Sequence, residues 1–292
     1  MSTGGTGAAT LQGYVETSNC VITRVPLWPS RMASQNTSRP TPNVETTPIP
    51  VIATRGCFNV LIIAPVSKLF RWVGALVFLL SLLSFAYVYV VRLGVPAPDT
   101  GHITRDVVFN VTLFTIFALH HSVMARTGAK AWITRLAPPA LERSIYVWIA
   151  SVLFLAVCWL WRPLPGVIWE TRGAGLALYV VQVFGATLTI AAARIVGVWE
   201  LAGVKQPDPA KAVEFTANGP FAIVRHPIYL AWVLMVFATP VMTTSRMVFA
   251  VISTLYLIVA IRFEERSLVD AFGDNYVAYQ RQMRWRLIPY IW

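Results

Sequence analysis

Long apolar stretches alternate with short polar segments over most of this chain. Each stretch is close to the roughly 20 apolar residues that a helix needs to cross the hydrocarbon core of a bilayer. The pattern predicts six spanning or near-spanning helices, at residues 70–91, 107–125, 144–161, 176–195, 228–242 and 247–263. The fifth is the shortest and holds Pro240 near its end, so we expect it to be tilted or paired tightly with the sixth as a hairpin. The predicted fold is all-α, a polytopic membrane protein with five to six transmembrane helices and a C-terminal cytoplasmic amphipathic segment that holds the juxtamembrane residues Arg281, Arg284 and Arg286.

Composition and charge placement support this prediction. The chain is 56% hydrophobic and only 13% charged, with a mean hydropathy of +0.60, which excludes an ordinary soluble domain. With the N-terminus inside, 19 of the 24 Lys and Arg residues fall on the side of the two termini, as expected for cytoplasmic segments. We therefore expect a bacterial inner-membrane protein with both termini and its active site in the cytoplasm. Anionic lipid headgroups account for the net charge of +11 without a nucleic-acid partner.

The first 67 residues differ from the rest of the chain. They are rich in Ser, Thr, Pro, Asn and Gly and show little apolar periodicity, which predicts a disordered polar tail before a membrane-embedded domain at 68–292. No charged segment followed by a short apolar stretch and a cleavage site is present, so a secretory signal is not expected. A start codon downstream of Met1 is an alternative explanation of the tail.

Two clusters of ionisable residues flank the last apolar hairpin. Arg225 and His226 precede it in Val-Arg-His-Pro-Ile-Tyr, and Glu264 and Glu265 follow it in Phe-Glu-Glu-Arg-Ser-Leu. Charged groups at a membrane edge are costly and often mark functional sites. Pro227 fits the first turn of a helix, where free N–H groups attract anions. The clusters therefore predict an anion site and a cation site on the same side of the membrane.

Structural explanations for the two clusters remain open at this stage. Arg225 and His226 could be anchors at the level of the lipid phosphates. The two glutamates could pair with Arg262 and Arg266 along one helix, although such pairs contribute only about 0.2 to 0.5 kcal/mol. A ligand with a carboxylate and a sulfonium, such as S-adenosylmethionine, would give both clusters a function.

The C-terminal motifs carry a resemblance to a known family. Arg-His-Pro-x-Tyr from Arg225, Glu-Glu-x-x-Leu from Glu264, Phe-Gly-x-x-Tyr-x-x-Tyr from Phe272 and a basic stretch ending in Ile-Pro follow one another at the end of the hairpin. This order resembles the isoprenylcysteine carboxyl methyltransferase and phospholipid methyltransferase superfamily. The resemblance covers 218–289, which it implies is the cofactor-binding catalytic unit.

The N-terminal half narrows the resemblance. Phe-Ala-Leu-His-His-Ser-Val-Met-Ala-Arg from Phe117, Glu-Arg-Ser-Ile-Tyr-Val from Glu142 and Trp-Leu-Trp-Arg-Pro-Leu-Pro-Gly from Trp159 are similar to the methanethiol S-methyltransferase branch and to NnrU-type membrane proteins. Two positions depart from the relatives: Ala231 stands where a Gly is frequent, and Val198 stands where the thiol-methylating branch has a His. The first change keeps a small residue, whereas the second bears on the identity of the substrate.

The resemblance implies a membrane methyltransferase that uses S-adenosylmethionine and methylates a small thiol such as methanethiol. The implied cofactor-binding residues are Arg225, His226, Tyr229, Glu264, Glu265, Tyr276 and Tyr279. The catalytic candidates are His226, Arg225 and His120, and either histidine could accept the thiol proton near neutral pH. No metal site is expected, because the four histidines lack inward-facing partners on another spanning helix. We expect His120 and His121 to line the substrate or cofactor site.

Other acceptors and one non-enzymatic function remain as alternatives. An isoprenylcysteine-like carboxylate would need no base, and a phospholipid amine would need a wider opening between helices. The chain could also be a membrane accessory protein of the NnrU type that has kept the fold. The sequence leaves the oligomeric state undetermined. The expected partners are a small-molecule or lipid-like methyl acceptor and the lipid bilayer.

Overall fold

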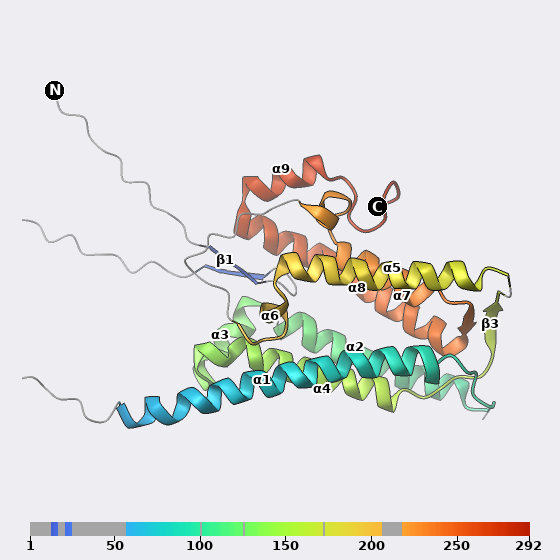
Figure 1. Ribbon diagram of the computed structural model, residues 1–292, viewed down its shortest axis with the longest axis horizontal. Coiled ribbons are helices and arrows are strands. Elements are labelled where there is room, and N and C mark those ends of the chain that lie inside the picture. The colour runs from blue at the N-terminus through green and yellow to red at the C-terminus, as the bar shows by residue number, and fades with distance from the viewer. Residues whose placement is uncertain are drawn as a thin grey trace, which may run out of the picture.

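The structure is a computed structural model of the 292-residue chain, and it is a bundle of helices (Figure 1). It describes residues 13–16, 21–24, 57–99, 101–124, 126–171, 173–205 and 218–292. Most of the predicted polar tail therefore lies outside the described residues, and its disorder stays a prediction. The two short described segments, β1 (Gly13–Glu16) and β2 (Val21–Arg24), pair as antiparallel strands.

Five helices of the described chain are long and apolar enough to cross a membrane, which confirms the predicted fold class. They are α1 (Cys57–Tyr87), which continues in a π-helical turn η1 (Val88–Arg92), α2 (Ile103–Met124), α4 (Glu142–Leu160), α5 (Gly175–Val196) and α8 (Thr244–Phe272). Many of their apolar side chains are exposed on the outside of the bundle, where lipid would cover them. The protein is an integral membrane protein.

The fifth predicted helix is much shorter than its hydrophobic stretch. Helix α7 (Pro227–Phe237) has 11 residues and rises about 16 Å, about half of the hydrocarbon thickness. The chain then leaves the helix before Pro240 and forms strand β4 (Val241–Thr243), which pairs antiparallel with β3 (Val167–Glu170). The prediction of a helix to residue 242 was therefore too long, because the last residues of the apolar stretch pair as a strand.

Shorter elements gather mainly at the opposite end of the bundle from β3 (Figure 1). They are α3 (Thr127–Leu136), η2 (Pro139–Leu141), α6 (Val198–Leu201), η3 (Gly219–Ala222) and α9 (Asp274–Gln282). Helix α9 belongs to the C-terminal amphipathic segment that the sequence predicted. The ends of α2, α5 and α8 and the start of α7 lie at this same end, so ionisable groups from distant parts of the sequence can meet there.

Helices α5 and α7 pack closely through small residues. A Cβ at Gly185 would lie 2.8 Å from the Ala231 carbonyl oxygen and 2.9 Å from Cγ of Met235. Ala231 itself is completely buried. The Ala231 side chain is therefore compatible with close helix approach, as the sequence predicted, because the facing helix supplies a glycine.

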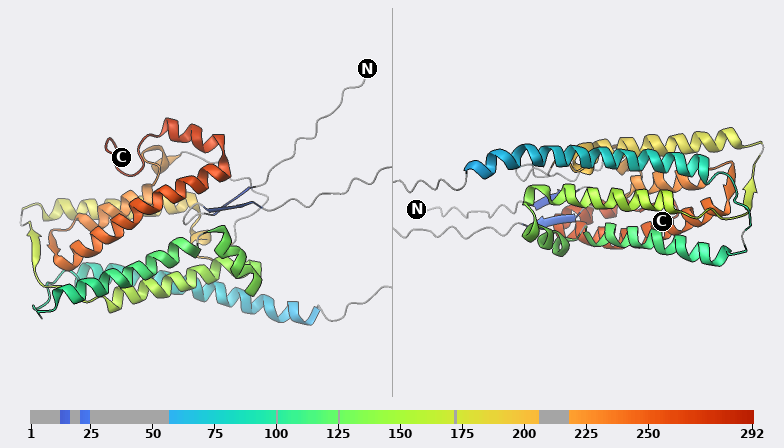
Figure 2. Two further views of the ribbon diagram at one scale, coloured as in Figure 1. Left: turned by 180° about the vertical axis from the view of Figure 1, so that it is seen from behind. Right: turned by 90° about the horizontal axis from the view of Figure 1, so that it is seen from below.

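Arg246 joins helix α1 to the α7–α8 hairpin near the β3 end. Its Nε donates to the Tyr89 carbonyl oxygen (3.0 Å), its Nη2 to the Val90 carbonyl oxygen (2.7 Å) and its Nη1 to Oγ1 of Thr239 (2.8 Å). The carbonyls of Tyr89 and Val90 belong to η1, where a helix end leaves acceptors unpaired. The guanidinium therefore satisfies these acceptors and fixes α1 against the hairpin. Figure 2 shows the long helices running along the bundle in two further views.

Candidate active site

The start of helix α7 is held by the C-terminal segment of the chain. The Arg225 N–H donates to the Trp285 carbonyl oxygen and the His226 N–H donates to the Arg286 carbonyl oxygen, each at 2.9 Å. His226 is the N-cap of α7, and Pro227 takes the first helical position as the sequence predicted. The Arg-His motif and the closing basic stretch, some 60 residues apart, are therefore fixed side by side.

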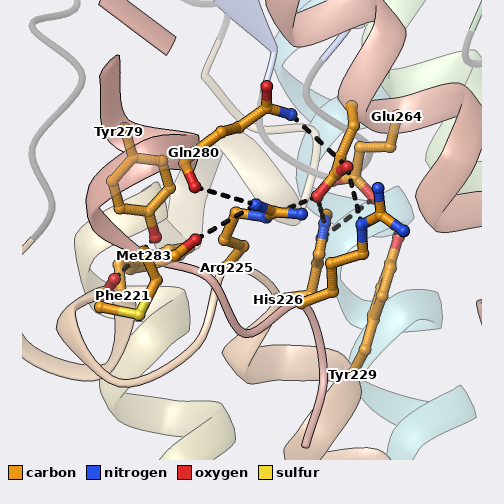
Figure 3. A network of polar contacts seen from close by, with 10 residues as sticks. Phe221, Arg225, His226, Tyr229, Glu264, Tyr279, Gln280 and Met283 are labelled. Atoms are coloured by element: carbon orange, nitrogen blue, oxygen red, sulfur yellow. Dashed lines mark hydrogen bonds and ion pairs between the residues drawn. The ribbon is translucent and has the colours of Figure 1, made fainter. Parts of the chain in front are cut away.

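Glu265 of α8 is the centre of a buried polar network. Figure 3 shows the network around Arg225 and His226. Its Oε1 lies 2.7 Å from Nε of Arg225 and 3.3 Å from Nε2 of His226, and its Oε2 lies 3.2 Å from Nε of Arg286. The Arg225 and Glu265 side chains are each 7% exposed. Arg225 also donates through Nη1 to the Met283 carbonyl oxygen at 3.1 Å. Glu265 is thus neutralised within the protein, and its main effect is to fix the two arginines and the histidine.

Glu264 has a different environment from its neighbour. Oε2 of Glu264 accepts a hydrogen bond from the Tyr229 hydroxyl at 2.7 Å, and Nδ1 of His226 lies 3.7 Å from the same oxygen. The His226 and Tyr229 rings are stacked, with centroids 5.4 Å apart. The Glu264 side chain is only 10% exposed, yet no arginine or lysine of the described chain forms an ion pair with it. Its negative charge is therefore available to a bound cation.

Tyr276 and Tyr279 lie on α9, next to the network. Both side chains are buried in a small apolar cluster with Leu268. The Tyr279 hydroxyl donates to the Phe221 carbonyl oxygen at 2.6 Å, which attaches α9 to the turn before Arg225 (Figure 3). The geometry gives these two residues a packing role beside the site. Direct contact of either one with a cofactor stays a prediction.

Sequence reasoning did not single out two members of the network. Arg286 pairs with Glu265, and the Gln280 side-chain amide lies 3.5 Å from the same carboxylate. Arg286 belongs to a stretch with Arg281 and Arg284 that had been interpreted as juxtamembrane basic residues. The signal that could have found it is its place directly before the Leu-Ile-Pro end of the family motif.

The other predicted site residue, His120, lies at the end of α2. Its ring stacks on Tyr146 of α4 with centroids 6.2 Å apart, and both ring nitrogens are buried without a hydrogen-bond partner in the described chain. Its neighbour His121 contacts the same tyrosine, with Nδ1 2.8 Å from the hydroxyl. The α2 histidines therefore share an end of the bundle with the C-terminal network, and both rings contact Tyr146.

Val198, which replaces a family histidine, starts the short helix α6. Its side chain is 47% exposed. The segment after it packs on α4, where Nε of Arg143 donates to the Glu200 carbonyl oxygen (2.9 Å) and the Ser144 hydroxyl donates to the Gly203 carbonyl oxygen (2.6 Å). The departure from the family therefore lies beside the α2–α4 end and not within the Glu265 network.

Comparisons with known proteins agree with these motifs. The family described as phospholipid methyltransferase matches residues 171–275. Methanethiol S-methyltransferase of Mycobacterium tuberculosis is 38% identical over 231 residues, which cover 74% of this chain and 94% of the relative. Methanethiol S-methyltransferase 1 of Bradyrhizobium diazoefficiens is 38% identical over 243 residues, covering 77% of this chain and 85% of the relative. Nurim of Rattus norvegicus is 26% identical over 224 residues, which cover 67% of this chain and 83% of the relative.

No solved structure matches the chain significantly. The sequence-based resemblance to the superfamily and to its thiol-methylating branch is confirmed by the relatives. Their names also confirm that the chain is a methyltransferase and so an enzyme. Since a relative that is 38% identical is covered over 94% of its length, the chain belongs to the methanethiol S-methyltransferase family of membrane proteins.

Proposed function

We propose that the protein transfers a methyl group from S-adenosylmethionine to a small thiol such as methanethiol. The observation that carries this proposal is the buried network around Glu264 and Glu265 at one end of the α7–α8 hairpin. It occurs in a chain that matches methanethiol S-methyltransferases over most of its length.

The charges of the network fit those of the proposed methyl donor. A carboxylate that is almost fully buried is costly unless it is paired. Among the described residues, the Glu264 oxygens contact the Tyr229 hydroxyl and, farther away, His226. The sulfonium or ammonium of the donor would supply the missing positive charge. Arg225, at the N-terminus of α7, suits the donor carboxylate. Glu265 would act on the donor indirectly, by holding Arg225 and His226 in place.

When bound, the donor supplies an electrophilic methyl group, and the protein supplies position and a proton acceptor. The thiol S–H proton passes to a base, the thiolate sulfur forms a bond to the methyl carbon, and the bond from that carbon to the sulfonium sulfur breaks. Alignment of the two reactants and removal of water from the thiolate would give most of the acceleration. The sequence-based candidates for the base are His226 and His120, with Arg225 as a positioning group.

The distribution of Lys and Arg residues supports a cytoplasmic location for the proposed site. Both termini and the charged clusters fall on the side that carries most of the Lys and Arg residues, which supports a cytoplasmic site in a bacterial inner membrane. The donor would enter from the cytoplasm. A volatile, apolar thiol could reach the site through the bilayer.

A phospholipid amine is a second candidate acceptor, because the phospholipid methyltransferase family matches residues 171–275. That stretch contains Arg225, His226, Tyr229 and both glutamates, which we assign to the donor. The match therefore supports the donor half of the proposal more than any particular acceptor.

Calorimetric titration of the purified protein in detergent with S-adenosylhomocysteine tests the donor site. We expect saturable binding to the wild type and affinity at least tenfold weaker for Glu264→Gln, in which the charge is lost but the bond to Tyr229 can remain. His102→Asn is a matched control, since this exposed histidine lies at the other end of α2. Folded wild-type protein that binds no S-adenosylhomocysteine would refute the proposal.

The acceptor is tested by turnover with methanethiol and, separately, with phosphatidylethanolamine vesicles. Formation of dimethyl sulfide from methanethiol supports the proposed reaction. Methylation of the lipid amine without dimethyl sulfide formation would replace the thiol by the second candidate.

A further inference from the structure

The core-facing stripe of helix α2 ends in a histidine. Phe114 and Ala118 are buried in the main hydrophobic core, and Phe117 packs against it. His121 follows Phe114 by seven residues and Phe117 by four, so it continues the same face of the helix. The Phe117 and His121 ring centroids are 5.7 Å apart. His120 is turned by about 100° from this position. The residue at the inner face of the α2 end is therefore His121.

A buried tyrosine fixes the orientation of the His121 ring. Tyr146 of α4 is 5% exposed, and its hydroxyl lies 2.8 Å from Nδ1 of His121. The ring of Tyr146 also lies beneath the Arg143 guanidinium, with 5.7 Å between the guanidinium carbon and the ring centroid. The Tyr146 hydroxyl also lies 3.3 Å from Nε2 of His121, so it contacts the nitrogen-bearing edge of the ring and holds the ring in place for proton transfer.

A pair of hydroxyl groups links this end of α2 to the helix that carries the glutamates. Ser122 Oγ of α2 lies 2.9 Å from the hydroxyl of Tyr256 on α8. Tyr256 precedes Glu264 by eight residues, about 12 Å along the same helix. Arg126 strengthens the same helix contact, with its guanidinium carbon 4.8 Å from the centroid of the Phe263 ring. The α2 end and the donor network are therefore two parts of one region between α2 and α8.

The matches to known proteins also separate the α2–α4 end of the chain from the donor network. The stretch shared with phospholipid methyltransferases, 171–275, contains the donor residues but not α2 or α4. The match to the Mycobacterium tuberculosis thiol methyltransferase is more than twice as long and must extend well beyond that stretch. Features that distinguish a thiol acceptor from a lipid amine are therefore expected in the part of the chain outside 171–275, where His121, Ser122 and Tyr146 lie.

We infer that His121, oriented by Tyr146, accepts the proton of the thiol, and that the α2–α4 end is the acceptor half of the active site. This inference rests on the proposed function. The thiol S–H bond breaks as the proton moves to a ring nitrogen of His121, and the thiolate attacks the methyl group held at the Glu264 side. After transfer, the imidazolium returns the proton to solvent. His226 stays with the donor, because both carboxylates of the network surround it.

Several titratable or charged groups surround this end and belong to the electrostatic environment of His121. They are His120 on α2, Lys130 on α3, Glu142, Arg143 and Tyr146 on α4, and Tyr256 and Glu264 on α8. Because cations and two largely buried carboxylates lie together here, a change in the pH profile must be compared between matched variants and not interpreted from one protein alone.

The test compares His121→Asn with His120→Asn and with the control His102→Asn. Each purified protein is titrated with S-adenosylhomocysteine, and the pH dependence of kcat/KM is measured with methanethiol and with an aryl thiol that is already ionised at neutral pH. We expect His121→Asn to bind S-adenosylhomocysteine as the wild type does. Its kcat/KM for methanethiol at neutral pH should fall by about 100-fold or more, the loss typical of a missing general base.

The aryl thiol separates a proton acceptor from a structural residue. Because it needs no deprotonation, its kcat/KM in His121→Asn should fall by much less than that of methanethiol, and higher pH should restore part of the methanethiol rate. An equal loss for both thiols, or a larger methanethiol-specific loss in His120→Asn, would overturn the assignment. Either result with intact binding of S-adenosylhomocysteine leaves the proposed function standing. Absence of binding in folded wild-type protein would instead refute the proposed function itself.

Discussion

Replacing Glu265 by Gln should destabilise the protein strongly while Glu264→Gln should not. The two residues are adjacent, have the same charge and are both nearly buried, so the pair of variants is closely matched. Glu265→Gln removes the counter-charge from Arg225, whose side chain is 7% exposed and whose Nε lies 2.7 Å from the carboxylate. Glu264→Gln removes a charge whose partner is the neutral Tyr229 hydroxyl.

The expected magnitudes follow from what each change leaves behind. Breaking a buried ion pair by removing one partner typically costs about 3 to 5 kcal/mol, because the remaining charge stays buried and uncompensated. The contact of Glu265 with Arg286 adds little, since the Arg286 side chain is 38% exposed and such pairs contribute about 0 to 1 kcal/mol. We therefore expect a loss of about 3 kcal/mol or more for Glu265→Gln. For Glu264→Gln we expect a loss below about 1 kcal/mol, because the amide oxygen can still accept from Tyr229.

The assay is unfolding in mixed micelles with increasing sodium dodecyl sulfate, followed by tryptophan fluorescence. The double variant Arg225→Gln/Glu265→Gln completes a cycle, and it should be more stable than the sum of the two single losses predicts, because no buried charge is left unpaired. Equal stability of Glu265→Gln and the wild type would refute the reasoning that Glu265 compensates Arg225. A loss in Glu264→Gln as large as that in Glu265→Gln would refute the distinction between the two carboxylates.

Three further predictions concern parts of the fold outside this network. Gly185→Val should lower the unfolding free energy by about 1 to 3 kcal/mol, because its Cβ would lie 2.8 Å from the Ala231 carbonyl oxygen, whereas Gly173→Ala, with no atom within 4 Å of its new Cβ, should have little effect in the same assay. Arg246→Met should lower the unfolding free energy by roughly 3 kcal/mol, because buried carbonyls of η1 are left unpaired. The affinity for S-adenosylhomocysteine in calorimetry should not change, since about 27 Å of helix α8 separates Arg246 from the donor site. Burial lowers the pKa of Lys130 on α3 to about 8, so the folded state binds this proton more weakly than the unfolded state, and the unfolding free energy of the wild type should rise between pH 8 and 10.5. The rise should be smaller in Lys130→Met, and equal rises in the two proteins would contradict this prediction.

The membrane helices could be predicted well from the sequence because the signal for them is local. Five of the six predicted stretches became long helices, three of them with bounds within about four residues of the prediction, and Pro227 took the first helical position. Helix α1 begins at Cys57, earlier than the predicted 70, because the segment before the apolar stretch continues the helical hydrogen bonding. Hydropathy could not show that residues 241–243 pair with β3, since an apolar strand and an apolar helix end look alike in composition.

Sequence reasoning grouped Arg225, His226, Tyr229 and the two glutamates, but it missed Arg286 and Gln280 and did not separate the roles of the members. Sequence grouped Glu264 with Glu265 as two similar acids. In the structure they differ because adjacent residues on a helix point about 100° apart, so one meets two arginines and the other meets Tyr229. Arg286 looked like one of several juxtamembrane basic residues, and only the return of the chain beside Arg225 brings it to Glu265.

The sequence by itself determined that this chain enters a membrane and to which family it belongs. Those properties follow from the transfer free energy of each segment and from short motifs, which are sums over neighbouring residues. The tertiary structure decided which carboxylate is neutralised inside the protein and which of the α2 histidines faces the core. Those outcomes depend on distances between segments that lie 20 to 160 residues apart in the chain, such as Glu265 to Arg286 and Tyr89 to Arg246, and only packing of the whole bundle sets them.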